Sequence, residues 1–202
     1  MSAPQATAGA TAAPTSAPAH TAAPPSRALP GGGTSRLHRL VAIVADKPGV
    51  LNRVASLMRA RNFNIDSLAV SRTDREGESR MTISLHGDDI AVEQAAKQLY
   101  RLIDVLKVQD VTAEPSVEHE LALVKVRVGD SNRADVLKLI ELTRGRVLDV
   151  SPEAVIAEVT GSESEVDNFV ACVRPFGIKE LVRTGAVVMA RGAGSIEEAV
   201  KR

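Results

Sequence analysis

Residues 38–68 read HRLVAIVADKPGVLNRVASLMRARNFNIDSL, and two patterns in this stretch decide the expected fold. Residues 40–45 form a short apolar run rich in β-branched side chains, which predicts a strand, and the turn-forming residues 46–49 end it. Apolar residues then recur at helical spacing, at Val50, Val54, Leu57 and Met58. A strand, a tight turn and a helix are therefore expected in this order.

The start of the expected helix is a candidate binding site for a small carboxylate. Its first backbone N–H groups have no partner within the helix, and the helix dipole adds partial positive charge beside Gly49 and Val50. Gly49 has no side chain to block a ligand. In the simpler interpretation, residues 46–49 are only a tight connection, because such turns are common and most bind nothing. Asn64, at the start of a second expected strand, could receive the ammonium group of the same ligand.

The composition of the whole chain narrows the function classes. The 202 residues are 44% hydrophobic and only 2% aromatic, which is enough for one or two aliphatic cores. Lys+Arg and Asp+Glu number 25 each, so no net field attracts nucleic acid or an anionic membrane. The single cysteine, Cys172, cannot form an internal disulfide, and no stretch approaches the roughly 18 apolar residues of a membrane span. We expect a cytoplasmic protein with no nucleic-acid or membrane partner.

Residues 1–35 differ from the rest of the chain. They are rich in Ala, Pro, Thr and Ser, and Arg27 is their only charged side chain. Such a segment has too little large apolar surface to offset its chain entropy, which predicts a disordered tail. The segment fits neither a secretory signal nor a mitochondrial transit peptide. At the other end of the chain, residues 193–202 are expected to form a short C-terminal tail.

Beyond residue 64 the pattern predicts one supersecondary unit and then repeats it. The first unit continues with strands and a helix at residues 65–71, 79–85, 92–102 and 105–111. This order, β-α-β-β-α-β, is the ferredoxin-like arrangement of an antiparallel four-stranded sheet with both helices on one face and the other face open.

The second unit follows Pro115 and has the same order. Its elements are expected at residues 121–128, 133–143, 146–150, 155–160, 166–173 and 178–182. The predicted fold class is therefore α+β, with two ferredoxin-like βαββαβ domains at residues 36–112 and 113–192. Open sheet faces and edge strands favour self-association, so a homodimer is expected.

No group of residues suggests catalysis or a metal site. The four histidines lie far apart without metal-ligand spacing, and Cys172 lies beside an apolar helical stripe where packing is the expected role. Motifs for a nucleophile elbow, a dinucleotide or a phosphate loop are missing from the sequence. An RNA-recognition module would need stacking aromatics on its central strands. An acylphosphatase-like site would need a phosphate-binding glycine-rich loop and an arginine after the first strand. This chain has ADKPGVLNR there, and its arginine, Arg53, is expected to be solvated on the helix and not to bind phosphate.

Several segments carry a family resemblance. The Pro-Gly-Val-Leu turn at residues 48–51, opening a βαββαβ unit, resembles the amino-acid-binding ACT domain. Longer segments resemble the regulatory (small) subunit of acetolactate synthase: RNFNIDSL (61–68), SRMTI (79–83), LIDVLKV (102–108), ELALVKV (120–126) and RTGAVVMARG (183–192). The resemblance covers about residues 36–192. It implies an ACT domain for amino-acid binding and dimerisation at 36–112 and the C-terminal regulatory-subunit domain at 113–192.

The resemblance implies a noncatalytic subunit that carries no cofactor of its own. Such a chain binds and activates a separate catalytic (large) subunit and confers feedback inhibition by L-valine in branched-chain amino-acid biosynthesis. The catalytic subunit would carry thiamine diphosphate, Mg²⁺ and FAD, and would condense two pyruvates, or pyruvate with 2-oxobutyrate. The alternative is a free-standing amino-acid-sensing ACT dimer without an enzyme partner.

The resemblance also implies a valine site shared by two chains, between the glycine turn of one and the asparagine strand of the other. Amides at Gly49 and Val50 would bind the carboxylate, Asn64 with carbonyls near Ile65 would bind the ammonium, and an aliphatic wall would hold the isopropyl group. Burying that group contributes about 2 kcal/mol. One methylene changes discrimination by only about 1–3 kcal/mol, so leucine or isoleucine could compete. The remaining predicted site residues are Asp46, Pro48, Leu51 and Ser71.

Two positions depart from the pattern that the resemblance implies. Asp46 stands where asparagine is common, and Ser71-Arg72 stands where a smaller residue and proline are common. Asp46 would repel a carboxylate if its side chain pointed into the site, and the Ser71 hydroxyl would narrow the pocket wall and need a partner. Sensitivity to valine is therefore a separate question from the identity of the subunit.

Overall fold

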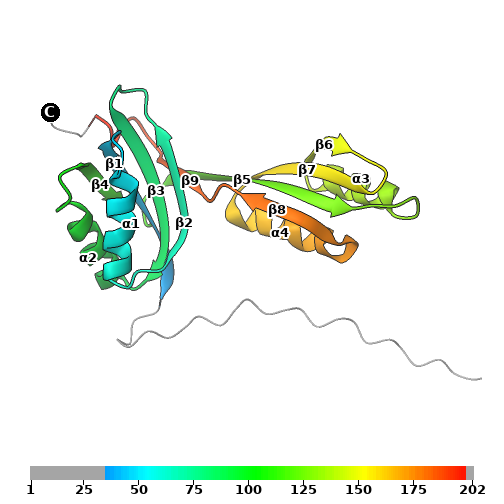
Figure 1. Cartoon of the computed structure of the whole chain (residues 1–202), viewed down its shortest axis with the longest axis horizontal. Helices are drawn as coiled ribbons and strands as arrows, with labels where there is room; N and C mark the ends of the chain where they lie inside the picture. The colour runs from blue at the N-terminus through cyan, green and yellow to red at the C-terminus, as the bar shows by residue number, and fades with distance from the viewer. Residues whose placement is uncertain (1–34, 199–202) are drawn as a thin grey trace, which may run out of the picture.

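A computed structural model describes residues 35–198, which form two α+β units placed end to end along the long axis of the molecule (Figure 1). The tail predicted at residues 1–35 lies outside the described residues except for Ser35. The last residues of the predicted C-terminal tail, 199–202, also lie outside them.

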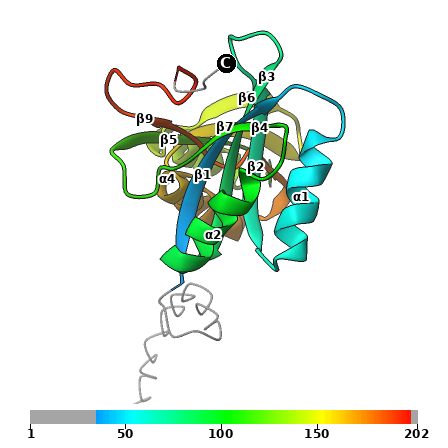
Figure 2. The same cartoon turned by 90° about the vertical axis from the view of Figure 1, so that its left-hand side faces the viewer.

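The first unit has the predicted order of elements. They are β1 (Arg36–Ala45), α1 (Val50–Ala60), β2 (Ile65–Arg72), β3 (Glu78–Gly87), α2 (Asp89–Leu99) and β4 (Val105–Asp110). The strands form one antiparallel sheet in the order β2-β3-β1-β4, and α1 and α2 lie side by side on one face of it (Figure 2). The ferredoxin-like prediction is confirmed.

The core of the first unit follows from the two periodicities in its sequence. Every second residue of β1 from Leu40 to Val44 points toward the helices, and each helix contributes one apolar stripe. These buried side chains are Leu40, Ala42, Val44, Val50, Val54, Met58, Val92, Ala95 and Leu99.

Helix α2 (Asp89–Leu99) begins and ends three residues before the expected range 92–102. The Asp88 carboxylate caps it by accepting a hydrogen bond from the Ala91 N–H at 2.7 Å. It ends at Leu99 because the N–H groups of Arg101 and Leu102 bond to carbonyls three residues back, which forms a tighter turn. Leu102 still packs against the core.

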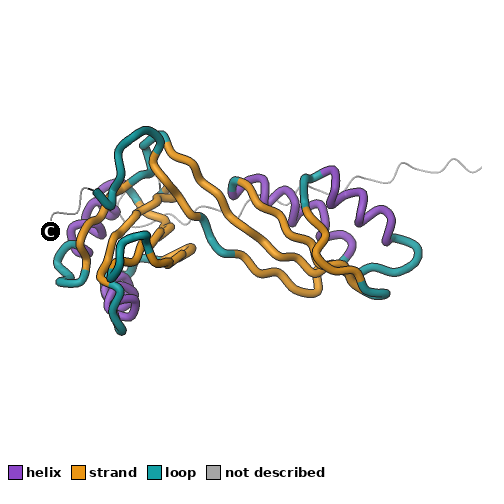
Figure 3. The backbone as a smooth tube through the Cα atoms, turned by 90° about the horizontal axis from the view of Figure 1, so that it is seen from above, coloured by secondary structure: helices purple, strands orange, loops and turns teal. Residues whose placement is uncertain are grey.

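The second unit repeats the topology. Its elements are β5 (Ser116–Arg127), α3 (Arg133–Leu142), β6 (Arg146–Val150), β7 (Ala154–Gly161), α4 (Glu163–Val173), the 3-10 helix η1 (Arg174–Phe176) and β8 (Ile178–Arg183). The strand order β6-β7-β5-β8 matches the first sheet, and both helices lie on one side of the sheet (Figure 3). A separate buried cluster around Phe169 and Ile140 fills the space between sheet and helices.

A two-stranded ribbon joins the units. Strand β5 is longer than predicted: its residues 116–119 pair with β9 (Val187–Ala190), and the rest of β5 pairs with β7 and β8. The sequence reasoning did not anticipate β9. We name the paired residues 116–119 and 187–190 the junction ribbon (Figure 1).

The prediction of an open sheet face is wrong for the first unit. On the side of the sheet away from the helices, Ala186 and Val188 pack against Val41 and Val111, and Arg80 donates a hydrogen bond to the Val188 carbonyl at 2.8 Å. The physical reason is visible in β1, whose residues 40–44 are apolar without alternation, as expected for a strand buried on both faces.

Candidate functional site

The turn between β1 and α1 leaves the first backbone amides of the helix available. Gly49 is the N-cap with a φ of +87°, a left-handed conformation that glycine adopts without strain, and no side chain of the described residues caps the helix. The first regular helical hydrogen bond runs from the Arg53 N–H to the Gly49 carbonyl, and the Val50 N–H makes only a long contact of 3.4 Å with the Lys47 carbonyl. A Cβ placed on Gly49 would meet nothing within 4 Å. A carboxylate can therefore approach these amides.

The residues around Gly49 have different roles. Val50 is only 3% exposed and its side chain belongs to the core, so its amide alone is available to a ligand. Leu51 is 46% exposed, which leaves its side chain free to contact a ligand or a second chain. Pro48 is exposed within the turn.

The two positions that depart from the family pattern contact each other. Arg72 Nε lies 2.9 Å from Asp46 Oδ2, so the negative charge of Asp46 is paired and is held toward the end of β2. The pair contributes little to stability because the Arg72 side chain is 84% exposed. It does reduce the repulsion that Asp46 would exert on a carboxylate ligand.

Ser71 lies at the same end of the sheet as Gly49 but on the face away from α1. It pairs in register with Arg80, which contacts the C-terminal segment, whereas Val70 pairs with the core residue Met81 and shares the helix side. Val70 is half-exposed and is the β2 side chain that shares a face with Leu51 at this end.

Asn64 and Ile65 lie at the opposite end of the sheet from Gly49. Ile65 and His38 both pair with Leu85, which puts the start of β2 beside the start of β1, whereas Gly49 follows the end of β1. Helix α1, whose 11 residues span about 16 Å, separates the two positions. One chain therefore does not bring Gly49 and Asn64 together.

Arg53 is not simply solvated, as the sequence suggested. Its guanidinium lies 2.7 Å from Asp104 Oδ2, and the backbone carbonyl of Asp104 accepts a hydrogen bond from Ala45 at 2.8 Å. Asp104 is buried and belongs to the LIDVLKV segment. The ion pair fixes the first half of α1 to the loop before β4, beside the Gly49 turn.

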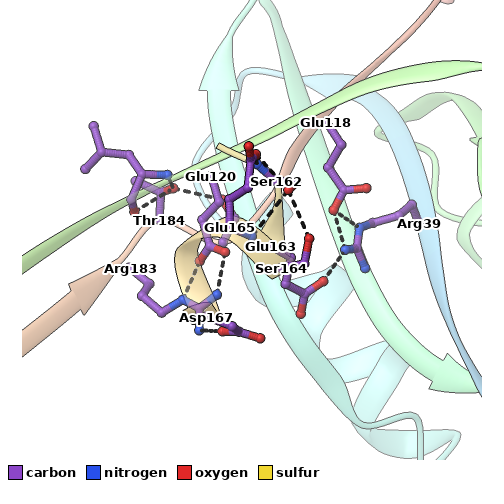
Figure 4. A network of polar contacts seen from close by, with 12 residues as sticks. Arg39, Glu118, Glu120, Ser162, Glu163, Ser164, Glu165, Asp167, Arg183 and Thr184 are labelled. Carbon is purple, nitrogen blue, oxygen red and sulfur yellow. Dashed lines mark hydrogen bonds and ion pairs between the residues drawn. The ribbon is translucent and has the colours of Figure 1, made fainter. Parts of the chain in front are cut away.

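Sequence reasoning missed a charged network where the two units meet (Figure 4). Arg39 of β1 donates hydrogen bonds to Glu118 of β5 at 3.1 Å and to Glu163 of α4 at 2.7 Å. Burial disfavours the charged form of this side chain, but the bonds and the attraction of the two carboxylates outweigh it, so the pKa of Arg39 lies above its ordinary value. These partners lie 79 and 124 residues away along the chain, so spacing gave no signal for them.

A second arginine makes a parallel set of contacts within the second unit. Arg183 donates two hydrogen bonds to Glu120, at 2.7 and 2.6 Å, and one to Asp167 at 2.7 Å. The bonds to Glu120, more than the opposing burial, hold the pKa of Arg183 above its ordinary value. The sequence did carry two signals for these contacts. Glu118 and Glu120 are two residues apart on a strand and so share a face, and Glu163 and Asp167 are one helical turn apart on α4.

None of the helices in residues 35–198 has both the length and the hydrophobicity needed to cross a bilayer. Within the same part of the chain, His, Cys, Asp and Glu side chains nowhere gather in threes that could hold a metal ion.

Comparison with known families matches both units. The family described as "AHAS small subunit-like ACT domain" matches residues 40–107, and the family described as "Small subunit of acetolactate synthase" matches residues 119–192.

Similar proteins cover most of the chain. An acetolactate synthase small subunit of Aquifex aeolicus is 47% identical and the match covers 82% of this chain and 87% of that protein. A probable acetolactate synthase small subunit of Archaeoglobus fulgidus is 49% identical, with 77% and 97% covered. The crystal structure of the small subunit from Thermotoga maritima has a TM-score of 0.73 at 40% identity and covers 79% of this chain and 99% of that chain.

Proposed function

The chain belongs to the family of acetolactate synthase small subunits, and from this premise we propose that it binds the catalytic (large) subunit, raises its turnover and makes it sensitive to L-valine. In this proposal two copies of the chain form a dimer through their first units. Thiamine diphosphate, Mg²⁺ and FAD belong to the catalytic subunit, and this chain carries no cofactor.

The observation that carries the proposal is the position of the two halves of the predicted site. Gly49 and Asn64 lie at opposite ends of α1, and β2, which runs between these ends, is an edge strand of the sheet that residues 35–198 form. If two β2 strands pair in antiparallel fashion around a two-fold axis, the end of β2 in one chain lies beside the start of β2 in the other. That pairing brings Gly49 of one chain close to Asn64 of its partner, and creates two equivalent sites per dimer.

The chemistry at such an interface suits a branched-chain amino acid. The uncapped amides after Gly49 bind the carboxylate. The side-chain carbonyl of Asn64 and nearby backbone carbonyls bind the ammonium, and the exposed apolar side chains of Leu51 and Val70 supply contact for the isopropyl group. Asp46 is paired with Arg72 and does not leave an unbalanced negative charge at the rim.

A site between two chains explains how a chain without catalytic groups can regulate an enzyme. An amino acid bound across the interface stabilises the interface geometry that fits it best. This differential affinity is the free energy that can shift the catalytic partner between active and inhibited states.

The free-standing sensor remains the second candidate function. A sensor needs only the first unit, whereas this chain carries a second unit whose edge strands β6 and β8 expose several large apolar side chains. These are Val147, Leu148, Val150, Leu181 and Val182. Exposed apolar residues on edge strands suit contact with another protein, which favours the regulatory subunit.

Acetolactate formation tests the proposal directly. The rate of the catalytic subunit from the same cell is measured alone, with this chain, and with this chain plus L-valine. We expect the chain to accelerate turnover and valine to reverse the acceleration. Acceleration that valine leaves unchanged would refute the valine site and keep the subunit assignment. Absence of acceleration with the cognate partner would refute the proposed function and leave the free-standing amino-acid sensor as the candidate function.

A further inference from the structure

The two arginines at the junction form matched sets of contacts, and only one of them links the units. We name Arg39 with Glu118 and Glu163 the interdomain rung, because Arg39 belongs to the first sheet and Glu163 to helix α4 of the second unit (Figure 4). We name Arg183 with Glu120 and Asp167 the intradomain rung, because β8, β5 and α4 all belong to the second unit. Each arginine thus has one carboxylate on β5 and one on α4.

The interdomain rung is placed where it can control the angle between the units. The junction ribbon connects them through two strands, and two-stranded ribbons take a larger twist than wider sheets. Arg39 of β1 bonds to Glu118 within the ribbon and, outside the ribbon, to Glu163 of α4, and its side chain is only 10% exposed. The partly buried, charge-assisted bond to Glu163 is an attachment outside the ribbon, and it resists rotation about the ribbon.

The start of β2 contacts this junction. Ser67 lies two residues after Ile65, and a Cβ placed on Gly185 would come within 2.7 Å of the Ser67 Cβ, so the two segments are in close contact. Around this contact lies a cavity of about 440 Å³, lined by Ser67, Leu68, Arg39, Glu163 and Gly185 among others. The strand that holds one half of the proposed valine site therefore contacts the second unit and has space beside it in which to move.

We propose that the interdomain rung couples L-valine binding at the start of β2 to the orientation of the second unit. This inference rests on the proposed function, which supplies the ligand and the site. A ligand that fixes Asn64 and Ile65 changes the position of Ser67 against Gly185. Because Arg39 joins α4 to the first sheet, the second unit follows that change as a body instead of absorbing it in the ribbon. Arg39 and Glu163 are positioning residues in this role.

The chain offers a matched pair of variants for the test. Glu163→Gln weakens the interdomain rung and leaves Arg39 bound to Glu118. Asp167→Asn, one helical turn later on the same helix, weakens the intradomain rung and leaves Arg183 bound to Glu120. Both substitutions conserve the shape of the side chain and remove one negative charge, so they differ chiefly in whether the weakened contact crosses between the units.

Amide hydrogen exchange of the full chain, with and without L-valine, gives the first readout. In the wild type we expect valine to slow exchange at residues 49–51 and 64–68 and to change exchange at the start of α4 by about 5-fold, the lower range of allosteric coupling. Glu163→Gln is expected to keep the slowing at the site and lose the change in α4. Asp167→Asn is expected to keep both.

Inhibition of the cognate catalytic subunit gives the second readout. We expect Glu163→Gln to retain activation without valine and to raise the valine concentration for half-inhibition by about 5-fold or more, whereas Asp167→Asn follows the wild type. Identical behaviour of the two variants overturns the inference. So does valine-dependent slowing at residues 49–51 and 64–68 without any change in wild-type α4. If the wild type shows no slowing at those residues, the proposed valine site fails and the inference fails with it.

Discussion

The first helices of the two units occupy equivalent places and differ in the charge of their first turns. Helix α1, with Gly49 as its N-cap, has no acidic residue in its first turn, whereas α3 carries Asp135 in its first turn. The loop before α3 is also closed on itself, because Asn132 Oδ1 accepts a hydrogen bond from the Gly129 N–H at 2.7 Å. Asp135 thus puts a negative charge of the protein near the positive end of α3, whereas the first turn of α1 has no such charge to oppose an external carboxylate. In the proposed function, two units with one topology differ through a few residues at one turn.

Gly49→Asp tests the comparison with the largest expected effect. An aspartate at the N-cap supplies its own carboxylate to the amides that valine would use, and aspartate tolerates the left-handed backbone better than most residues. We expect valine binding to fall by about 100-fold or more, which is the loss of a charge-assisted contact plus repulsion. Titration calorimetry measures it, and activation of the catalytic subunit should persist. Loss of activation together with binding would show that the turn is structural.

Asn64→Ala is expected to have the second largest effect. A hydrogen bond to a charged ammonium contributes about 1.5–3 kcal/mol, so valine affinity should fall about 10- to 100-fold while thermal stability stays near that of the wild type. Asn64 is exposed, which keeps the substitution out of the core. Unchanged affinity in the same titration would exclude Asn64 from the site.

Asn52→Asp makes α1 resemble α3. Asn52 occupies the third position of its helix, as Asp135 does in α3, and both side chains are exposed. The new charge should stabilise the unliganded chain by about 0.3–1 kcal/mol through the helix dipole and lower valine affinity several-fold. Asp135→Asn should destabilise the chain by a similar amount without changing valine binding. Chemical denaturation and titration measure both, and an effect of Asp135→Asn on valine binding would contradict the difference between the units.

Arg72→Ala has the smallest expected effect. Without its partner, the Asp46 carboxylate at the site rim is unbalanced, so valine affinity should fall by at most about 5-fold, in line with an exposed ion pair. The double variant Asp46→Asn, Arg72→Ala should recover the lost affinity. Titration at low and high salt checks this, because screening should reduce the effect of Arg72→Ala. A loss that the double variant retains would assign Arg72 a direct contact with the ligand.

The sequence predicted the elements of both units because each has a clear periodicity and clear turn residues. The β5–β9 pairing escaped prediction because residues 187–190 are a short apolar run whose partners lie about 70 positions earlier, and local patterns carry no information on such pairing. The only sign in the sequence that both faces of the first sheet are covered was that apolar and polar residues do not alternate in residues 40–44. Arg39 could not be matched with Glu163 from sequence, since that contact depends on how the two units meet.

The candidate site is a different case. The turn at Gly49 could be identified from the residues alone, because Pro48 and Gly49 end a strand just before a helical stripe. The relation of Gly49 to Asn64 could not be identified from the residues alone, because that relation depends on the parallel course of β1 and β2 and on a second chain. Both residues therefore stay predicted parts of a valine site.

A mixed dimer tests the shared site most directly. Chains carrying Gly49→Asp and chains carrying Asn64→Ala are coexpressed with different affinity tags, and dimers that contain one of each are purified. One interface site then combines both substitutions, and the other has wild-type Gly49 facing wild-type Asn64. The account predicts that the mixed dimer binds one L-valine with wild-type affinity, although neither parent dimer does. If the mixed dimer binds no better than its parents, each site lies within a single chain and the account is contradicted.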